Sequence, residues 1–546
     1  MIGLFSFHGG LKTVRHKAES NQRAIQAYPV PRRLVVPLRQ HIGAIAKALV
    51  RPGDRVLKGQ MIGQADGYIS AAVHAPTSGV VTAVDPRPVP HPSGLPDLCV
   101  AIESDGEERW IEREPVDYRQ LHPSELRNRL RNAGVVGLGG AAFPSAVKLN
   151  PGDSGKPLET LILNGAECEP WITCDDRIMR ERAAGIVAGA HVMVHLLQPR
   201  EVLVGIEDDK PEAIAAMIAA CAGTGYQVRA VPTRYPSGSV KQLVRLLTGK
   251  ETPVDGLPVD VGVQCFNVAT AYTVHRAVER GEPVIARVVT VTGQVRQPGN
   301  IDALLGTPFA DLVDRCGGYL DGVERLIVGG PMMGFALHGD EVPVTKATNC
   351  ILAAGAAELA PERPVMSCIR CGACADACPA NLLPQQLYWH ARAREFDKAQ
   401  DFHLFSCIEC GCCSYVCPSH IPLVQYYRYA KNEIWAQEKE KEKAELARQR
   451  HQARVERLER EKQEREAKLR QKAPARAAPA TGEGEGGKLD IDAAVARAKP
   501  RLGSLTPNPS PSRGEGSESL SPNLSPSREE GSAPTPVESV AGERDG

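Results

Sequence analysis

Eight cysteines form two copies of one spacing, and thiolates at this spacing bind iron and sulfide. The copies are Cys368-x-x-Cys371-x-x-Cys374-x-x-x-Cys378-Pro379 and Cys407-x-x-Cys410-x-x-Cys413-x-x-x-Cys417-Pro418. Such a run predicts a pair of 4Fe-4S clusters. One short loop cannot surround a cubane, so we expect the fourth ligand of each cluster to come from the other copy. The predicted sets are Cys368, Cys371, Cys374 and Cys417 for one cluster, and Cys407, Cys410, Cys413 and Cys378 for the other.

Zinc and disulfide bonds are the competing uses of these cysteines. A structural zinc site closes with four ligands in paired Cys-x-x-Cys elements, which would leave the repeated third and fourth cysteines without a role. Disulfides suit small secreted domains, and we expect no signal peptide in this sequence. The doubled spacing therefore favours iron-sulfur chemistry. It predicts a helical two-cluster ferredoxin domain, with helices between and after the motifs.

A glycine-rich segment and an acidic segment upstream have the residue types of a nucleotide site. Gly137-Leu-Gly-Gly140 would let backbone N–H groups approach a phosphate, and Lys148 would add a positive charge. The next predicted strand ends at Asn164, and Glu167 and Glu169 follow it, where open α/β sheets place ligand contacts. Each signal alone is weak, because glycine turns and surface acidic pairs are common. Beside one-electron clusters, they predict a converter between two-electron and one-electron transfer.

Length and composition indicate a multidomain protein without a membrane span. The 546 residues, 42% hydrophobic and 24% charged, suffice for several folded domains. A net charge of zero gives no general attraction to nucleic acid, so we expect no nucleic-acid partner. The most apolar run, residues 183–197, is too short to cross a bilayer and predicts a buried helix. We expect a cytoplasmic protein, free or peripherally attached to a membrane.

The elements that must position these residues divide the sequence into seven predicted segments of mixed α/β and α+β type. An N-terminal arm (1–30) precedes an all-β module (31–110) that is rich in turn signals. Between 115 and 275, β-type runs alternate with helical periods, which predicts a Rossmann-like domain around a mainly parallel sheet. The remaining segments are an α+β module (285–345), the two-cluster domain (360–432), a long charged helix (433–472) and a disordered low-complexity tail (473–546).

Two of these modules resemble known domain families. The all-β module resembles the lipoyl and biotinyl carrier barrel, a barrel-sandwich fold in which an exposed hairpin carries a modified lysine. Here the hairpin reads Ser70-Ala-Ala-Val-His-Ala-Pro-Thr-Ser-Gly79 and has no lysine, so we expect a structural or docking role. The α+β module, with its turn Gly329-Gly-Pro-Met-Met-Gly334, looks like the soluble-ligand-binding β-grasp (SLBB) domain.

Together, the cysteines and the two upstream loops resemble the RnfC family, also called RsxC, over about residues 1–435. The α/β domain is similar to the flavin subunit of respiratory complex I, whose Gly-x-Gly-Gly-Ala-Gly-Phe-Pro-x-Gly-x-Lys and Asn-x-Asp-Glu-x-Glu-Pro loops hold FMN and NADH. By this resemblance, Glu167 and Glu169 would be the catalytic residues facing NADH. The residues that would bind the cofactor are Gly137, Gly139, Gly140, Lys148, Asn164, Tyr235, Gly238, Asn267 and Thr270. The sequence departs from the family pattern at Ala142, Ala146, Ala166, Ser239 and Val240.

The resemblance implies a function in membrane-linked electron transport. Rnf complexes couple electron transfer between NADH and ferredoxin to the translocation of ions. A protein of this family would accept hydride from NADH on FMN and pass single electrons through two 4Fe-4S clusters. It would dock on other Rnf subunits, especially the iron-sulfur protein RnfB, at the cytoplasmic face of the bacterial inner membrane, with only peripheral membrane contact.

Two alternatives remain open at the level of sequence. One is a soluble flavin and iron-sulfur reductase with a different acceptor, similar to the corrin reductases. The other is a non-enzymatic iron-sulfur adaptor whose flavin site has decayed through the departures named above. Retention of FMN and reduction of the clusters by NADH separate the adaptor from both enzymes.

Overall fold

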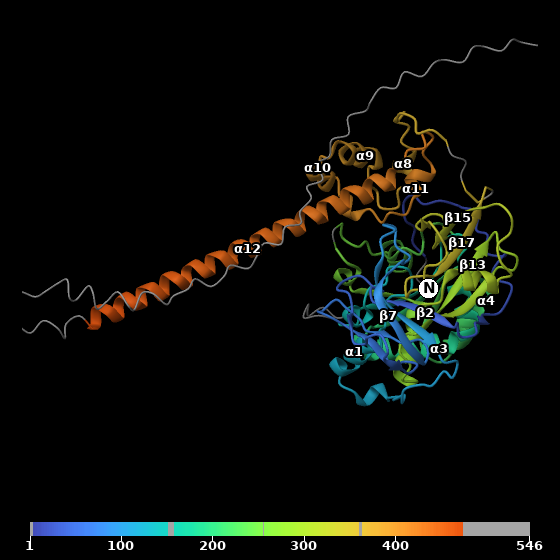
Figure 1. Ribbon diagram of the computed structural model, residues 1–546. Coiled ribbons are helices and arrows are strands. Elements are labelled where there is room, and N and C mark those ends of the chain that lie inside the picture. Colours follow the sequence, from blue (N-terminus) through green and yellow to red (C-terminus); the bar gives the residue numbers. More distant parts are fainter. Residues whose placement is uncertain (1–3, 151–157, 255, 357, 360–362, 473–546) are drawn as a thin grey trace, which may run out of the picture. The chain divides into compact units, whose positions relative to one another are not determined.

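The computed structural model of the protein describes residues 4–472, except 151–157, 255, 357 and 360–362 (Figure 1). The tail predicted at 473–546 lies outside the described residues. Met1–Gln449 make one compact unit, and this unit contains every predicted site residue. Among the helices described, none combines the length and the apolar content needed to cross a bilayer.

The all-β module consists of two small sheets that share one hydrophobic core. Alternate side chains, among them Val36, Ile62 and Ile102, point into this core from both sheets. One sheet has the order β2-β8-β7-β4 and the other β3-β5-β6. The strands are β2 (Arg33–Pro37), β3 (Lys47–Ala48), β4 (Arg55–Val56), β5 (Met61–Gln64), β6 (Val73–His74), β7 (Gly79–Arg87) and β8 (Asp97–Ser104).

The hairpin that carries a lysine in carrier barrels is buried in this protein. All residues from Ser70 to Gly79 are buried. Lys346, beyond the SLBB turn, donates hydrogen bonds from Nζ to the carbonyl oxygens of Ala72 (2.8 Å) and Gly134 (2.7 Å). This one ammonium group therefore joins the all-β module to the α/β domain. A buried hairpin that contacts two other segments agrees with the predicted docking role.

The α/β domain is built on a four-stranded parallel sheet in the order β11-β10-β9-β12. The strands are β9 (Thr160–Gly165), β10 (Glu201–Glu207), β11 (Gln227–Val231) and β12 (Val263–Asn267). The chain proceeds outward from β9 to β11 and then returns to add β12 on the other side of β9. The strand order thus reverses between β9 and β12. Open α/β sheets bind ligands outside the carboxyl ends of the strands at such a switch point.

Helices cover both faces of this sheet, as the alternation of β9 side chains requires. Leu161 and Leu163 pack in the cluster that includes α3 and α6, whereas Ile162 packs with α5 on the opposite face. The predicted buried helix at 183–197 is confirmed as the second part of α3. The elements are η1 (Tyr118–Gln120), α1 (Pro123–Asn132), α2 (Ser145–Lys148), α3 (Cys174–Leu197), α4 (Pro211–Ala220), α5 (Val240–Thr248), η2 (Pro258–Val261) and α6 (Val268–Glu279).

The SLBB module has a six-stranded sheet to which the N-terminal arm contributes. The order is β1-β14-β13-β17-β15-β16, and β1 of the arm pairs in parallel with β14. The sheet thus extends beyond the segment expected from sequence, both through the arm and through β17. Its elements are β1 (Gln26–Ala27), β13 (Ala286–Gly293), β14 (Gly299–Leu304), α7 (Phe309–Arg315), β15 (Val323–Val328), β16 (Phe335–Leu337) and β17 (Cys350–Gly355).

Short helices follow each cysteine loop in the two-cluster domain. The helical segment expected between the motifs is split, because Arg394 adopts a left-handed φ of 59° and ends α9. The predicted charged helix continues the last helix of this domain as one element, α12, drawn in orange in Figure 1. The elements are α8 (Ala373–Asp376), α9 (Pro384–Ala393), α10 (Phe396–Asp401), η3 (Leu404–Ser406), α11 (Cys412–Tyr415) and α12 (Leu423–Lys472).

The close approach of α3 and α6 gives a test of this packing. A Cβ atom at Gly189 of α3 would overlap the carbonyl oxygen of Ala271 in α6. We expect Gly189→Ala to lower the free energy of unfolding by about 1–3 kcal/mol, although alanine favours helix formation. Calorimetric melting checks this, with Ala184→Val on the exposed side of α3 as the control. Equal melting temperatures for Gly189→Ala and the unmodified protein would contradict the packing.

Candidate redox site

Two asparagines predicted to bind the cofactor lie side by side at the switch point. Asn164 ends β9, Asn267 ends β12, and the two are register partners. The amide of Asn164 donates to the carbonyl oxygen of Gly238 (2.8 Å). The Oδ1 atom of Asn267 accepts hydrogen bonds from the N–H groups of Ala269 (2.8 Å) and Thr270 (3.4 Å) and so caps α6. Both side chains are therefore held in place before any ligand binds.

The predicted glycine turn lies against this pair of asparagines. The N–H of Gly137 donates to Phe143 (2.8 Å) and closes the turn. A Cβ atom at Gly139 would lie 3.2 Å from the Cβ of Asn267, so the turn approaches β12 closely. Gly140 has φ +106° and open space where a Cβ would stand. The turn thus presents exposed backbone at the switch point, as phosphate binding requires.

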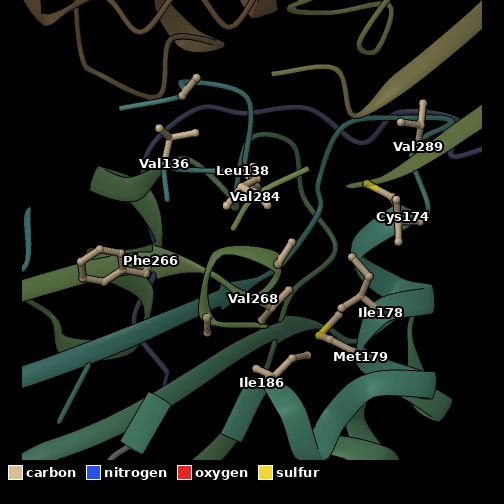
Figure 2. Close-up of a cluster of buried hydrophobic side chains, with 14 of the residues drawn as sticks. Val136, Leu138, Cys174, Ile178, Met179, Ile186, Phe266, Val268, Val284 and Val289 are labelled. Carbon is tan, nitrogen blue, oxygen red and sulfur yellow. The ribbon is translucent and has the colours of Figure 1, made fainter. Parts of the chain in front are cut away.

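Packing and one hydroxyl group anchor the turn to α6. Val136 and Leu138 are buried in the same cluster as Val268, the first residue of α6 (Figure 2). The N–H of Leu138 donates to the hydroxyl of Thr270 (2.9 Å). Ala142, which replaces a family glycine, adopts a left-handed φ of 46° and is buried. The turn therefore keeps a glycine-like backbone at a non-glycine residue.

The amine of Lys148 lies on β12. Its Nζ donates to the carbonyl oxygen of Cys265 and lies 4.5 Å from the centroid of the Phe266 ring. Burial lowers the pKa of Lys148. The described contacts place this amine two residues before Asn267, and its contribution to FMN binding stays a prediction.

Glu167 holds the amino end of α3. Its carboxylate accepts hydrogen bonds from the N–H groups of Asp175 (2.7 Å) and Asp176 (3.4 Å), and Lys17 of the arm lies 3.7 Å from it. Burial raises the pKa of Glu167 to about 8, and the nearby ammonium of Lys17 opposes this shift. The predicted contact of Glu167 with NADH stays a prediction.

Glu169 joins the same loop to the SLBB turn. Its Oε1 atom accepts hydrogen bonds from the N–H groups of Met332 (2.7 Å) and Met333 (2.9 Å). A Cβ atom at Gly330 would overlap the side chain of Glu169, so the contact requires glycine at that position. Burial raises the pKa of Glu169. The described geometry gives Glu169 a joining role, and its role toward NADH remains a prediction.

Sequence reasoning missed Asp175, which contacts the asparagine pair. Its Oδ2 atom accepts a hydrogen bond from Asn267 (2.5 Å), while the buried Oδ1 atom has no partner among the described residues. An unpaired buried carboxylate oxygen is costly, and a donor group on a ligand would satisfy it. The open glycine turn and this free acceptor fit a bound flavin nucleotide. Its sequence signal is an acidic pair at the start of a helix that directly follows the predicted ligand loop.

Tyr235 connects this site to the second cysteine motif. The side chain is fully buried, and its hydroxyl donates to the carbonyl oxygen of Cys410 (2.7 Å). The backbone of Tyr235 pairs with Leu11 of the arm through hydrogen bonds of 2.7 and 2.9 Å. Gly238, three residues later, accepts the hydrogen bond from Asn164. One short segment therefore contacts both the switch point and a predicted cluster loop.

The structure brings together both predicted sets of cysteines. One cavity is lined by Cys378, Cys407, Cys410 and Cys413, and another by Cys368, Cys371, Cys374 and Cys417. All sixteen cysteines of the sequence fall within the described ranges and are free thiols. Four free thiols around each cavity, three from one loop and one from the other, fit a 4Fe-4S cluster. Cys412 also lines the first cavity and begins α11.

The two cavities differ in their surroundings. The cavity with Cys378 lies next to the arm, because His8 Nδ1 is 3.0 Å from the carbonyl oxygen of Cys378 and Gly10 donates to Ala377 (3.0 Å). The other cavity is closer to solvent: Cys371 is exposed, and the neighbouring Ile369 is 68% exposed. The first of these cavities thus contacts the α/β domain and the arm, whereas the second has an open side.

A nucleotide-type switch point joined to two four-cysteine cavities defines an iron-sulfur flavoprotein. Comparison with family models agrees with this class. The matches are to an RnfC barrel sandwich hybrid domain (residues 5–107), a Nuo51 FMN-binding domain (130–276), an SLBB domain (288–336) and a 4Fe-4S dicluster domain (367–421). They confirm the predicted fold class and the predicted cofactors, FMN and 4Fe-4S clusters. The chain belongs to the RnfC family.

Curated relatives are named as the RnfC-type component of an ion-translocating oxidoreductase complex. The chain is 50% identical over 440 residues to the relative from Serratia proteamaculans, which covers 80% of this chain and 62% of that protein. It is 50% identical over 442 residues to the relative from Pseudomonas aeruginosa, with coverage of 81% and 57%. The chain thus spans three fifths or less of the length of these relatives.

A solved structure gives a weaker likeness. The NAD+-reducing [NiFe]-hydrogenase in the H2-reduced state matches with a TM-score of 0.41 at 17% identity, over 59% of this chain and 62% of that one. A score this low carries no argument about the fold or the site.

The raised pKa of Glu167 predicts a pH-dependent stability. A carboxyl group with a pKa of about 8 when folded and 4.5 as its ordinary value stabilises the fold below pH 4.5, and this contribution is lost as the pH rises towards 8. Glu167→Gln cannot titrate. We therefore expect the melting temperature of the unmodified protein to fall relative to that of Glu167→Gln between about pH 5 and pH 8. Parallel melting curves across this range would contradict the assignment.

Proposed function

We propose that this protein is the peripheral electron-input subunit of a membrane-bound Rnf-type complex. It would pass electrons between NADH and a ferredoxin-type partner through FMN and two 4Fe-4S clusters, while other subunits translocate ions. The observation that carries the proposal is the buried hydrogen bond from Tyr235 to Cys410 (2.7 Å). This bond joins the nucleotide-type site to a cluster loop, so that the two predicted redox centres are neighbours within one compact unit.

We assign FMN to the switch point on the chemistry of its residues. The exposed backbone at Gly139 and Gly140 suits the phosphate, and the fixed amides of Asn164 and Asn267 suit the polar edge of a flavin. The free oxygen of Asp175 is an acceptor for a flavin N–H group. FMN, when bound, supplies the exchange between a two-electron donor and one-electron carriers. The protein contributes the position of the cofactor and the charges around it.

We place the two clusters in series. The set with Cys378 lies against the arm and the α/β domain, whereas the set with Cys417 has an exposed member, Cys371. Electrons from the flavin site would thus reach the set with Cys378 first and leave from the set with Cys417. The exposed apolar side chains of Met366 (60%) and Ile369 (68%) beside this exit suit a protein partner. The partner would be another member of the complex, such as the iron-sulfur protein RnfB, at the cytoplasmic face of the inner membrane.

Anaerobic purification tests the cofactor assignment and the activity together. We expect about eight irons and about one FMN per chain, because each predicted cluster holds four irons. Addition of NADH should produce the EPR signals of reduced clusters. If the reconstituted protein neither keeps FMN nor shows reduced clusters with NADH, it is an iron-sulfur adaptor. A wholly soluble protein in native extracts that reduces cobalamin when pure would be a reductase of the corrin type.

A matched pair of variants tests the order of the clusters. Cys378→Ser and Cys417→Ser each remove the ligand that one loop contributes to the other set. We expect Cys417→Ser to leave one cluster that NADH still reduces. In Cys378→Ser, the remaining cluster should be reduced by dithionite and only slowly by NADH. The reverse pattern, or equal reduction by NADH in both variants, would overturn the proposed order.

A further inference from the structure

We propose that Lys17 of the N-terminal arm is a positioning residue for the acidic loop (residues 166–173) at the NADH side of the site. This inference rests on the proposed function. The arm has no assigned role, and sequence alone gave none. In the structure, Lys17 is only 9% exposed, and its ammonium group lies inside the curve of the loop.

The three N–H donors of Lys17 match three carbonyl oxygens of the loop. Its Nζ lies 2.7 Å from the carbonyl oxygen of Glu167, 2.9 Å from that of Glu169 and 2.5 Å from that of Ile172. An ammonium group has three donors and no acceptor, so this arrangement uses its full capacity. One point charge therefore fixes both limbs of the loop at once. A guanidinium group has a planar fork of donors and would not reproduce this geometry.

The loop needs such support because its backbone is unusual at two non-glycine residues. Glu167 has φ +49° and Trp171 has φ +71°, and both values lie in the left-handed region. Such conformations persist only where the surroundings determine them. Without the ammonium group, three buried carbonyl oxygens would lose their partner, and the loop would be free to relax.

Neighbouring residues of the arm follow the same loop. Arg15 donates from Nη1 to the carbonyl oxygen of Cys168 (2.9 Å), and its own carbonyl accepts from the N–H of Trp171 (2.9 Å). The ring of His16 stacks on Trp171 with centroids 4.1 Å apart. The arm thus forms the outer support of the loop, and Lys17 is its buried centre.

The charge of Lys17 also compensates the acidic groups on this side of the site. Glu167, Cys174 and Asp175 have possible ligand atoms within 4.8 Å of one another, a grouping that would suit a cation. Lys17 lies 3.7 Å from the carboxylate of Glu167 and supplies positive charge there. The flavin side, by contrast, depends on the glycine turn and the asparagines. Loss of Lys17 should therefore weaken the use of NADH while FMN remains bound.

The test uses the full-length protein with its cofactors and compares Lys17→Met with Lys12→Met, which changes an exposed lysine of the same arm. For Lys17→Met we expect the KM for NADH in ferricyanide reduction to rise about tenfold or more, with kcat within about threefold of the unmodified value. FMN content and the reduction of the clusters by dithionite should not change. Lys12→Met should behave as the unmodified protein does.

Each other outcome is decisive. An unchanged KM in Lys17→Met, or an equal rise in Lys12→Met, would overturn the positioning role. If Lys17→Met does not fold, Lys17→Arg keeps the charge and should still raise the KM with FMN bound. An unchanged KM in Lys17→Arg, or failure of both variants to fold, would show that Lys17 serves the fold alone. If the unmodified protein itself does not oxidise NADH, the proposed function fails, which is a separate result.

Discussion

The return of the chain to pair β12 with β9 is the constraint on which the site depends. It makes Asn164 and Asn267 register partners, although about a hundred residues separate them in the sequence. The glycine turn can then reach both β12 and α6, where the hydroxyl of Thr270 holds it. The segment from Tyr235 to Gly238 precedes this return and contacts Asn164 on one side and Cys410 on the other. One crossover thus determines where the flavin and cluster sites meet.

Backbone carbonyl groups and buried ammonium groups connect the segments around this site. Lys346 donates to carbonyl oxygens of the all-β module and the α/β domain, and Lys17 donates to three carbonyl oxygens of the acidic loop. Glu169 does the converse and accepts from two N–H groups of the SLBB turn. Buried groups of this kind tolerate little displacement, because an unpaired partner is costly. The modules are therefore held in one defined arrangement around the switch point.

The sequence predicted the modules and both sets of cysteines because these signals are local. Motif spacing and strand or helix periodicity act over a few residues, so they also gave the parallel sheet and the continuous α12. Contacts between distant segments left no such signal. Nothing in the composition of the arm indicates that Lys17 meets a loop 150 residues later, or that Glu169 binds the N–H groups of Met332 and Met333. The position of the Lys148 amine on β12 likewise depends on tertiary packing.

The N-terminal arm has a consequence for the order in which the protein is made. The ribosome synthesises the arm first, yet Leu11 pairs with Tyr235, β1 pairs with β14, and Gly10 donates to Ala377 beside a cluster ligand. These partners emerge hundreds of residues later. The arm therefore must wait through most of translation, and its last contacts form only when the cysteine loops exist. Completion of the NADH side is in this way linked to completion of the iron-sulfur domain, so that a chain truncated before the cysteines cannot assemble the whole entry site.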